Sequence, residues 1–219
     1  MTAPRCRLDH IAVTAPDLAG GARYVADFLG VELQVGGEHP TMATHNQLLR
    51  IGDAVFLEVI APNPAAPRPG RRRWFALDEQ TPATLPRLAG WIARSADVRA
   101  VAAAASEPLG ELLALERNAM RWEMTVPRDG SLGLGGAVPM VLQWDASGGP
   151  ASRLAEVGCR LHRLELHHPE PARVTALLAS IGLADERVAV IALAASEPPH
   201  LVAQIATPRG MRRLGGSGR

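Results

Sequence analysis

The sequence predicts an α+β fold in which repeated βαβββ units form curved, partly open mixed sheets with helices outside. Two observations support this class. Apolar residues alternate with a period of two in short runs, and helical stretches interrupt these runs in the same order three times. The tripeptide Cys159-Arg160-Leu161 also repeats Cys6-Arg7-Leu8 letter for letter. Each unit is too small for a core of its own, so the units must share one, and the faces opposite the helices line a concavity.

The whole chain, residues 1–219, is expected to be a single domain made of internal units. The first unit covers 5–62, the second and more degenerate unit covers 84–146, and a partial third unit covers 157–208. A proline-rich linker follows the first unit, and a Ser-Gly-Gly-Pro break precedes the third.

Ordinary strand and helix signals place the elements of the first unit. Residues 8–14 alternate as a strand, which puts His10 on the face opposite Ile11. Asp17 is a good N-cap for the following helix, and Gly30 is a good residue to end it. The remaining strands of this unit are expected at 31–35, which a Gly-Gly turn ends, at 45–51 and at 54–60.

The later units repeat this order with weaker signals. In the second unit we expect a strand at 88–94, a helix at 98–105, strand-like material within 111–124 and a final strand at 138–144. In the third unit we expect a helix at 171–181 and strands at 188–193 and 201–206.

Composition excludes several classes of function. The formal net charge of +1 gives no electrostatic footprint for nucleic acid. No apolar run approaches the roughly 20 residues that span a bilayer. No secretory leader is recognisable, so we expect no membrane partner and a cytoplasmic location. All 23 basic residues are Arg, which excludes Schiff-base catalysis and a P-loop lysine.

One imidazole and one carboxylate stand out within apolar strands. In the run VFLEVI, Glu58 shares a face with Phe56 and Ile60, where a carboxylate is costly unless it is paired or bound to metal. His10 has a comparable place on the first strand. A His and a Glu on adjacent strands suit a divalent ion such as Zn, Mn, Ni or Fe. A buried hydrogen-bonded pair without any ion is the alternative.

Five segments carry a family resemblance. Together they cover most of the chain before Asp145, and they resemble the vicinal oxygen chelate superfamily, with its glyoxalase/bleomycin resistance/dioxygenase fold, and more narrowly its glyoxalase-like domain proteins. The segments are LDHIAV (8–13), GGEHPTMATHNQLLRIGD (36–53), VFLEVIAPNP (55–64), RRWFALD (72–78) and PMVLQW (139–144).

The resemblance implies that each unit contributes metal ligands from its first and last strands. It therefore assigns His10 and Glu58 as ligands, with Glu58 also a candidate catalytic base. In the second unit the corresponding positions are Gly90 and Gln143, and Gln143 is the weaker oxygen ligand. In the third unit His162 or Arg163 takes the first position, and Arg163 would bind an anionic substrate.

The resemblance also suggests residues that contact substrate. His45 and Asn46 fall within a matching segment, and local capping of their strand is the alternative for both. Trp122 and Trp144 either pack in the core or line a cleft.

These residues lead to alternative functions. The first is a divalent-metal-dependent lyase or isomerase that acts on a small hydroxy- or keto-metabolite. Oxygen activation fits less well, because it usually requires two histidines and a carboxylate. The second is a metal-free protein that binds a small molecule, as resistance proteins do. The third is a structural subunit whose concavity is filled by side chains. A homodimer and a monomer both stay open.

Overall fold

The computed structural model describes residues 5–117, 120–145 and 148–216. Within these ranges the chain forms twelve strands and three α-helices, which follow one another as β1 (Cys6–Thr14), α1 (Leu18–Leu29), β2 (Gln34–His39), β3 (Thr44–Arg50), β4 (Phe56–Pro62), β5 (Arg87–Ser95), α2 (Val98–Ala104), β6 (Glu111–Arg117), β7 (Met120–Val126), β8 (Met140–Trp144), β9 (Arg160–His168), α3 (Pro171–Ser180), β10 (Val188–Ala192), β11 (His200–Thr207) and β12 (Gly210–Gly215). The predicted α+β class of curled sheets is confirmed.

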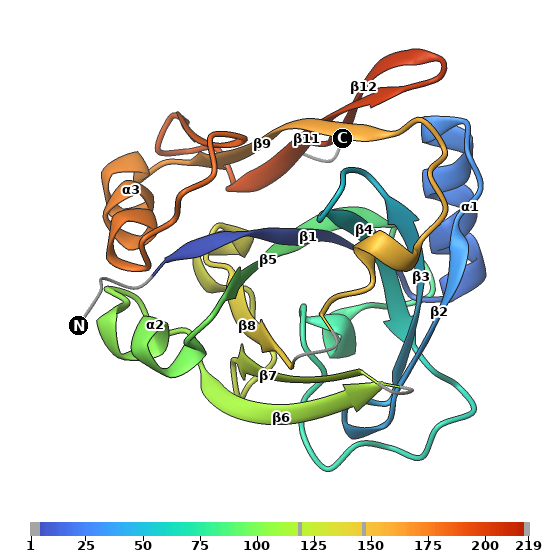
Figure 1. Cartoon of the computed structure of the whole chain (residues 1–219), viewed down its shortest axis with the longest axis horizontal. Coiled ribbons are helices and arrows are strands. Elements are labelled where there is room, and N and C mark those ends of the chain that lie inside the picture. Colours follow the sequence, from blue (N-terminus) through green and yellow to red (C-terminus); the bar gives the residue numbers. More distant parts are fainter. Residues whose placement is uncertain (1–4, 118–119, 146–147, 217–219) are drawn as a thin grey trace.

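The first two units share one curled eight-stranded sheet (Figure 1). The strand order is β2-β3-β4-β1-β5-β8-β7-β6. β1 and β5 pair antiparallel at its centre, while β1 is parallel to β4 and β5 is parallel to β8. Because the sheet curls, the two end strands β2 and β6 contact each other. The sheet thus encloses a concave face between its two ends.

The helix α1 begins and ends where the sequence predicts. The Asp17 side chain accepts a hydrogen bond from the backbone N–H of Gly20, and Gly30 adopts a left-handed conformation with φ of 73°. The buried residues Val25 and Leu29 of α1 belong to a core on the convex face of the sheet, with aliphatic residues of β1 and β4. The helix therefore covers the side of the sheet that faces away from His10.

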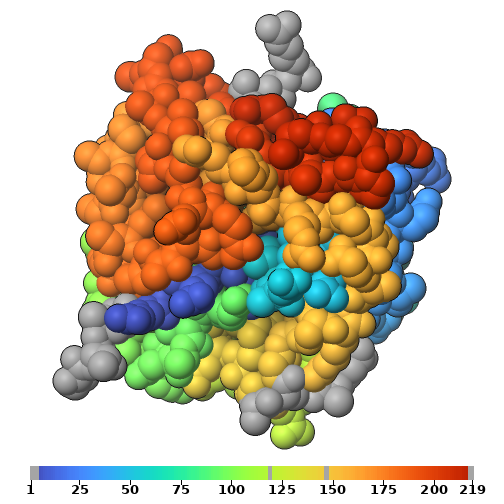
Figure 2. Space-filling model, turned by 45° about the horizontal axis from the view of Figure 1, so that its top comes forward, coloured from blue at the N-terminus to red at the C-terminus, as the bar shows by residue number. Residues whose placement is uncertain are grey.

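The third unit forms a separate four-stranded sheet with the order β10-β9-β11-β12. The first strand of this unit, β9, lies between β10 and β11 of the same unit, whereas β1 lies at the end of the order β2-β3-β4-β1, so the third unit does not repeat the strand order of the first. Its buried residues Leu164, Leu166 and Leu201 join the core on the convex face. Figure 2 shows this unit, orange to red, lying against the blue and green strands of the first two. The sequence did not predict β12.

Strand β2 differs from its prediction in a way that shapes the concave face. The strand was expected to end at a Gly-Gly turn, but it continues through both glycines to His39. The side-chain oxygen of Asn46 accepts a hydrogen bond from the Gly37 backbone at 2.8 Å, and a Cβ at Gly36 would overlap that amide. Glycine is required here because the Asn46 side chain lies against the β2 backbone.

Among the described residues, no helix has the length and apolar character needed to cross a membrane.

Candidate functional site

The structure brings His10 and Glu58 together on the concave face. His10 Nε2 lies 3.6 Å from Glu58 Oε2. The two residues are 6% and 5% exposed. They line a nearly closed cavity of about 20 Å³, room for about one water molecule or ion. The period-two alternation of β1 and β4 puts both side chains on this face, as the sequence indicated.

The His10 ring is fixed from behind by its sequence neighbour. Its Nδ1–H donates to Asp9 Oδ1 at 2.7 Å, and the ring stacks on Phe56 with centroids 4.2 Å apart. Burial opposes a charged imidazole, but hydrogen bonds and the negative charges of Asp9 and Glu58 outweigh it, so the pKa of His10 is raised above 6.5. The Nε2 atom is thereby left facing Glu58 and the cavity.

The Glu58 carboxylate is fixed in the same way. The Asn46 side chain donates to Oε1 while its own oxygen is held by Gly37. Burial alone would raise the pKa of Glu58. The hydrogen bond and charge of His10, with smaller contributions from His39 and Asn46, outweigh burial and lower this pKa to about 2. Glu58 is therefore ionised at neutral pH, and its charge together with that of Asp9 favours the imidazolium form of His10.

Two further polar residues reach the site from the ends of the curled sheet. His39, the last residue of β2, has its Nε2 4.0 Å from Glu58 Oε1. Arg117, the last residue of β6, donates from Nη1 to His39 Nε2 at 3.5 Å. Burial lowers the pKa of His39 to about 4, so its ring is neutral at pH 7. The sequence analysis missed both residues, because their proximity to Glu58 depends on the curl of the whole sheet.

Tryptophans form much of the remaining wall. Trp122 and Trp144 line the cavity with ring centroids 5.2 Å apart, and Trp144 donates its indole N–H to Asp9 at 2.9 Å. Trp74, on the segment between β4 and β5, packs edge-on against His39 at 5.1 Å. Both predicted tryptophans thus lie at the cavity, while their contact with a substrate stays a prediction. Trp74 was not predicted.

The second unit places apolar residues where the first has His10 and Glu58. In the antiparallel central pair His10 pairs with Ile92 and Ala12 with Gly90, so Gly90 takes the place of His10 and Ile92 that of Ala12. Glu58 pairs with Ala12 and Met140 with Ile92, so Met140 takes the place of Glu58. Gly90 is thus the expected position, whereas Gln143 lies three residues beyond Met140. Because side chains alternate along a strand, Gln143 faces outward, and its oxygen accepts from the Val98 backbone at 3.1 Å. The structure does not bring Gln143 to the cavity.

Two other predicted site residues also lie apart from it. Neighbouring side chains of β3 point to opposite faces. Asn46 reaches Glu58, so His45 lies on the other face of this strand. Arg163 lies on the four-stranded sheet with 46% of its side chain exposed, 3.9 Å from Glu165. The third unit covers the convex face, so its first strand cannot supply a residue to the concave one.

The donor set does not fit a resident divalent metal. His10 and Glu58 face each other at a distance that one ion could bridge, but catalytic zinc sites normally have three protein ligands. In the described part of the chain, no three His, Cys, Asp or Glu side chains are arranged to hold a metal ion. The second-unit counterparts Gly90 and Met140 offer no nitrogen or oxygen side-chain ligand, and His39 Nε2 accepts a hydrogen bond from the cation Arg117. We therefore derive no chemistry through a metal.

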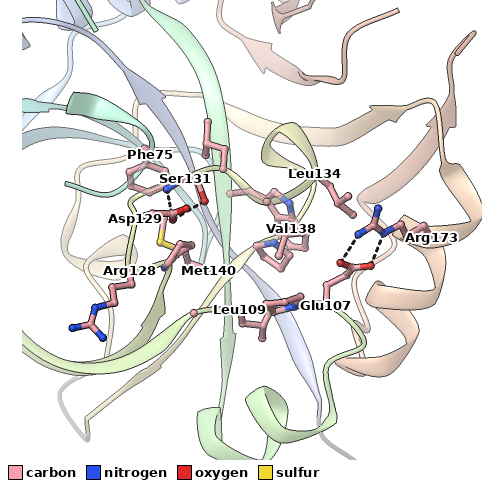
Figure 3. A pocket seen from close by; sticks show the side chains of 18 residues that line it. Phe75, Glu107, Leu109, Arg128, Asp129, Ser131, Leu134, Val138, Met140 and Arg173 are labelled. Atoms are coloured by element: carbon pink, nitrogen blue, oxygen red, sulfur yellow. Dashed lines mark hydrogen bonds and ion pairs between the residues drawn. The ribbon is translucent and has the colours of Figure 1, made fainter. Parts of the chain in front are cut away.

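A larger and more open pocket of about 570 Å³ adjoins the site (Figure 3). Phe75 lines both hollows and separates them. A Cβ at position 90 would press on the Phe75 ring at 3.2 Å, which explains why Gly90 stands opposite it. On the far wall Glu107 and Arg173 form a two-bond ion pair at 2.6 and 2.9 Å, which joins the second unit to α3.

Solved structures of similar fold span most of this chain. A hypothetical protein from Staphylococcus aureus matches with a TM-score of 0.54 and 13% identity, over 96% of this chain and 86% of its own. The Mn(II)-bound glyoxalase from Novosphingobium aromaticivorans matches with a TM-score of 0.46 and 13% identity, over 94% of this chain and 80% of its own. Methylmalonyl-CoA epimerase from Mycobacterium tuberculosis matches with a TM-score of 0.38 and 17% identity, over 63% of this chain and 85% of its own. At such identities the first likeness shows the fold alone.

Sequence comparison shows the family directly. No curated protein matches this chain. The family model for the glyoxalase-like domain matches residues 8–182, from the start of β1 to just beyond α3. The predicted resemblance to glyoxalase-like domain proteins is confirmed: this chain belongs to the glyoxalase-like domain family.

Proposed function

We propose that this protein catalyses proton transfer on a small hydroxy- or oxo-metabolite, as an isomerase or lyase, with Glu58 and His10 as its acid–base pair. One observation carries the proposal. A basic and an acidic group face each other at 3.6 Å in a cavity lined by buried residues, and each is fixed from behind, His10 by Asp9 and Glu58 by Asn46. Fixed orientation and exclusion of water are what acid–base catalysis requires.

The step can be written with this pair alone. Glu58 accepts the proton from the carbon next to a carbonyl, and His10 Nε2 donates its proton to the carbonyl oxygen, which gives a neutral enediol or enol. Return of the protons to different atoms isomerises the substrate. The two transfers are coupled, because the His10 charge holds down the pKa of Glu58. Once His10 has given up its proton, Glu58 becomes the stronger base.

The size of the cavity limits the reaction to a small molecule and requires movement. About 20 Å³ holds one water-sized group, so a substrate enters when Phe75, which lines both hollows, shifts. Phe75 lies on the long segment between β4 and β5 and has a strained left-handed backbone with φ of 56°. The larger pocket on the other side of Phe75 provides space next to the site.

Exchange of substrate C–H for deuterium in D₂O tests the proposal without knowledge of the product. A panel of small 2-hydroxy acids, 2-oxo acids and hydroxyketones would be followed by NMR. We expect at least one compound to exchange, and Glu58→Gln to slow this exchange by about 10²- to 10⁴-fold. Arg121→Gln, which changes an exposed arginine of β7, serves as control. Absence of exchange across the panel, or equal exchange by Glu58→Gln, would refute the assignment.

A metal-free binding protein is the second candidate, and the apolar half of the cavity favours it. Ile92, Leu142 and Met124 surround the polar pair with groups that carry no chemistry. The same panel distinguishes the two functions, because a binding protein would retain a compound in calorimetry without exchanging its protons.

A further inference from the structure

Two residues that line the cavity each have a buried hydrogen-bond donor without a partner. Among the described residues, neither Nε of Arg117 nor Nε1 of Trp74 makes a hydrogen bond, although both atoms are buried. The residues are 4% and 3% exposed, and both line the cavity that holds Glu58. An unmade hydrogen bond of a buried donor costs about 1–3 kcal/mol, and more for a charged group. Such a cost is typical of a site that a ligand completes.

The chemistry of these donors defines the ligand group. A guanidinium and an indole N–H have no acceptor capacity, so the missing partner must present acceptor oxygens. Among the described cavity residues Glu58 supplies one negative charge and Arg117 one positive charge, and His10 adds a second positive charge in its protonated form, which its partners favour. Asp9, behind His10, is also close to the cation Arg94, with Nη1 at 3.5 Å. With His10 protonated, the lining has one unmatched positive charge, which suits a monoanion.

Geometry connects this charge to the acid–base pair. His39 Nε2 lies 3.5 Å from Arg117 Nη1 and 4.0 Å from Glu58 Oε1. One small molecule can therefore contact both the guanidinium and the Glu58 carboxylate. Once Phe75 has shifted, a carboxylate held by Arg117 would have its adjoining carbon near Glu58, and the apolar residues Met124 and Leu142 line the same cavity.

We propose that Arg117 and Trp74 form an anion subsite that binds the carboxylate of a small 2-hydroxy- or 2-oxo-monocarboxylic acid, and so present its C2 oxygen to His10 and Glu58. The assignment of the C2 oxygen rests on the proposed function, whereas the anion subsite itself does not. Arg suits the role because its planar fork of donors matches a carboxylate.

Calorimetric titration with lactate and with lactamide tests the subsite. The two ligands have the same size and shape, but lactamide lacks the charge. We expect wild-type protein to bind lactate about 10- to 100-fold more tightly than lactamide, since a charge-assisted hydrogen bond contributes about 1.5–3 kcal/mol. Equal affinity for the two, or no lactate binding, would overturn the proposal.

Variants locate the binding within the cavity. Arg117→Gln should remove the preference for lactate, Arg117→Lys should retain part of it, and Trp74→Phe should weaken lactate binding while its ring still packs against His39. Arg121→Gln should bind lactate as wild type does. If Arg117→Gln does not fold, Trp74→Phe and the comparison of lactate with lactamide still decide the matter. Unchanged lactate affinity in both folded variants would contradict the subsite.

One further variant separates this inference from the proposed function. Glu58→Gln should lose deuterium exchange but still prefer lactate over lactamide. If Glu58→Gln and wild type exchange equally while Arg117→Gln loses lactate, the proposed reaction fails and the subsite stands. If Glu58→Gln stops exchange while Arg117→Gln binds lactate normally, the subsite fails and the reaction stands.

Discussion

The two halves of the concave face are built from the same unit but have opposite chemistry. In the first unit the central strand and its parallel neighbour present His10 and Glu58, which are buried and charged. In the second unit the corresponding positions present Gly90 and Met140, which carry no ionisable group. One unit thus supplies the acid–base pair, and the apolar residues of the other lower the polarity around it, which strengthens electrostatic interactions within the cavity. The second unit adds one charge of its own, the cation Arg117 at the end of β6.

The largest expected effect on stability comes from breaking the polar half. His10→Ala leaves the Glu58 carboxylate buried with Asn46 but without its close cationic partner, and we expect a loss of about 3–5 kcal/mol in unfolding free energy at pH 7. Urea denaturation measures it. The double variant His10→Ala/Glu58→Gln should regain at least half of the loss, because no charge is then left unpaired. A double variant no more stable than His10→Ala would show that the pair is not an ionic one.

A somewhat smaller effect should appear as pH dependence. The folded-state pKa of Glu58, about 2, lies below its ordinary 4.5, so its contribution to stability is complete above pH 4.5 and is lost as pH falls toward 2. The contribution is roughly 3 kcal/mol, since one pKa unit corresponds to about 1.4 kcal/mol. Urea denaturation between pH 2 and 6 should show this part of the acid slope in wild type, and Glu58→Gln should lack it. Parallel slopes in the two proteins would contradict the lowered pKa.

His10 has the opposite sign. Its pKa is raised, so its contribution is complete below its ordinary 6.5 and is lost as pH rises through the folded-state value. The ion pair therefore stabilises the fold most between pH 4.5 and pH 6.5, the ordinary pKa values of Glu58 and His10.

Metal binding sharpens the comparison of the two halves. Protein without a histidine tag should bind no stoichiometric Zn, Mn or Ni, and these ions should leave its unfolding free energy unchanged. The variant Ile92→His/Leu142→Glu places a second His–Glu pair opposite the first. We expect it to bind Zn and to gain about 2.7 kcal/mol when free Zn reaches 100 times its dissociation constant. Equal stabilisation of wild type would show that His10 and Glu58 suffice to hold a metal.

The smallest effect is expected outside both halves. Arg163→Ala changes an exposed side chain of the four-stranded sheet, so its effect on unfolding free energy should stay within about 0.5 kcal/mol. Deuterium exchange should be unchanged. Slower exchange in Arg163→Ala would place the third unit at the reactive site, contrary to its position on the convex face.

Local sequence signals predicted most of the elements that position the site. The caps Asp17 and Gly30 define α1, and alternation along β1 and β4 puts His10 and Glu58 on one face. These features depend on neighbours within a few residues. Register between distant strands is not local, which is why Gln143 was expected in place of Met140, the true counterpart of Glu58 three residues earlier.

The residues that were missed come together only through the complete fold. His39 and Arg117 meet because the ends of an eight-stranded sheet curl toward each other, and no spacing in the sequence records that closure. A local sign did exist for His39. The paired glycines before it read as a turn, but they allow Asn46 to pack against the strand that continues to His39.

The protonation state of His10 tests the central claim most directly. NMR titration of the His10 ring in wild type and in Glu58→Gln would measure it. The account predicts a pKa above 6.5 in wild type, since Asp9 and Glu58 outweigh burial, and a clear decrease in Glu58→Gln. A wild-type pKa at or below 6.5, or the same pKa in both proteins, would show that the two groups do not form the ion pair on which the proposed reaction depends.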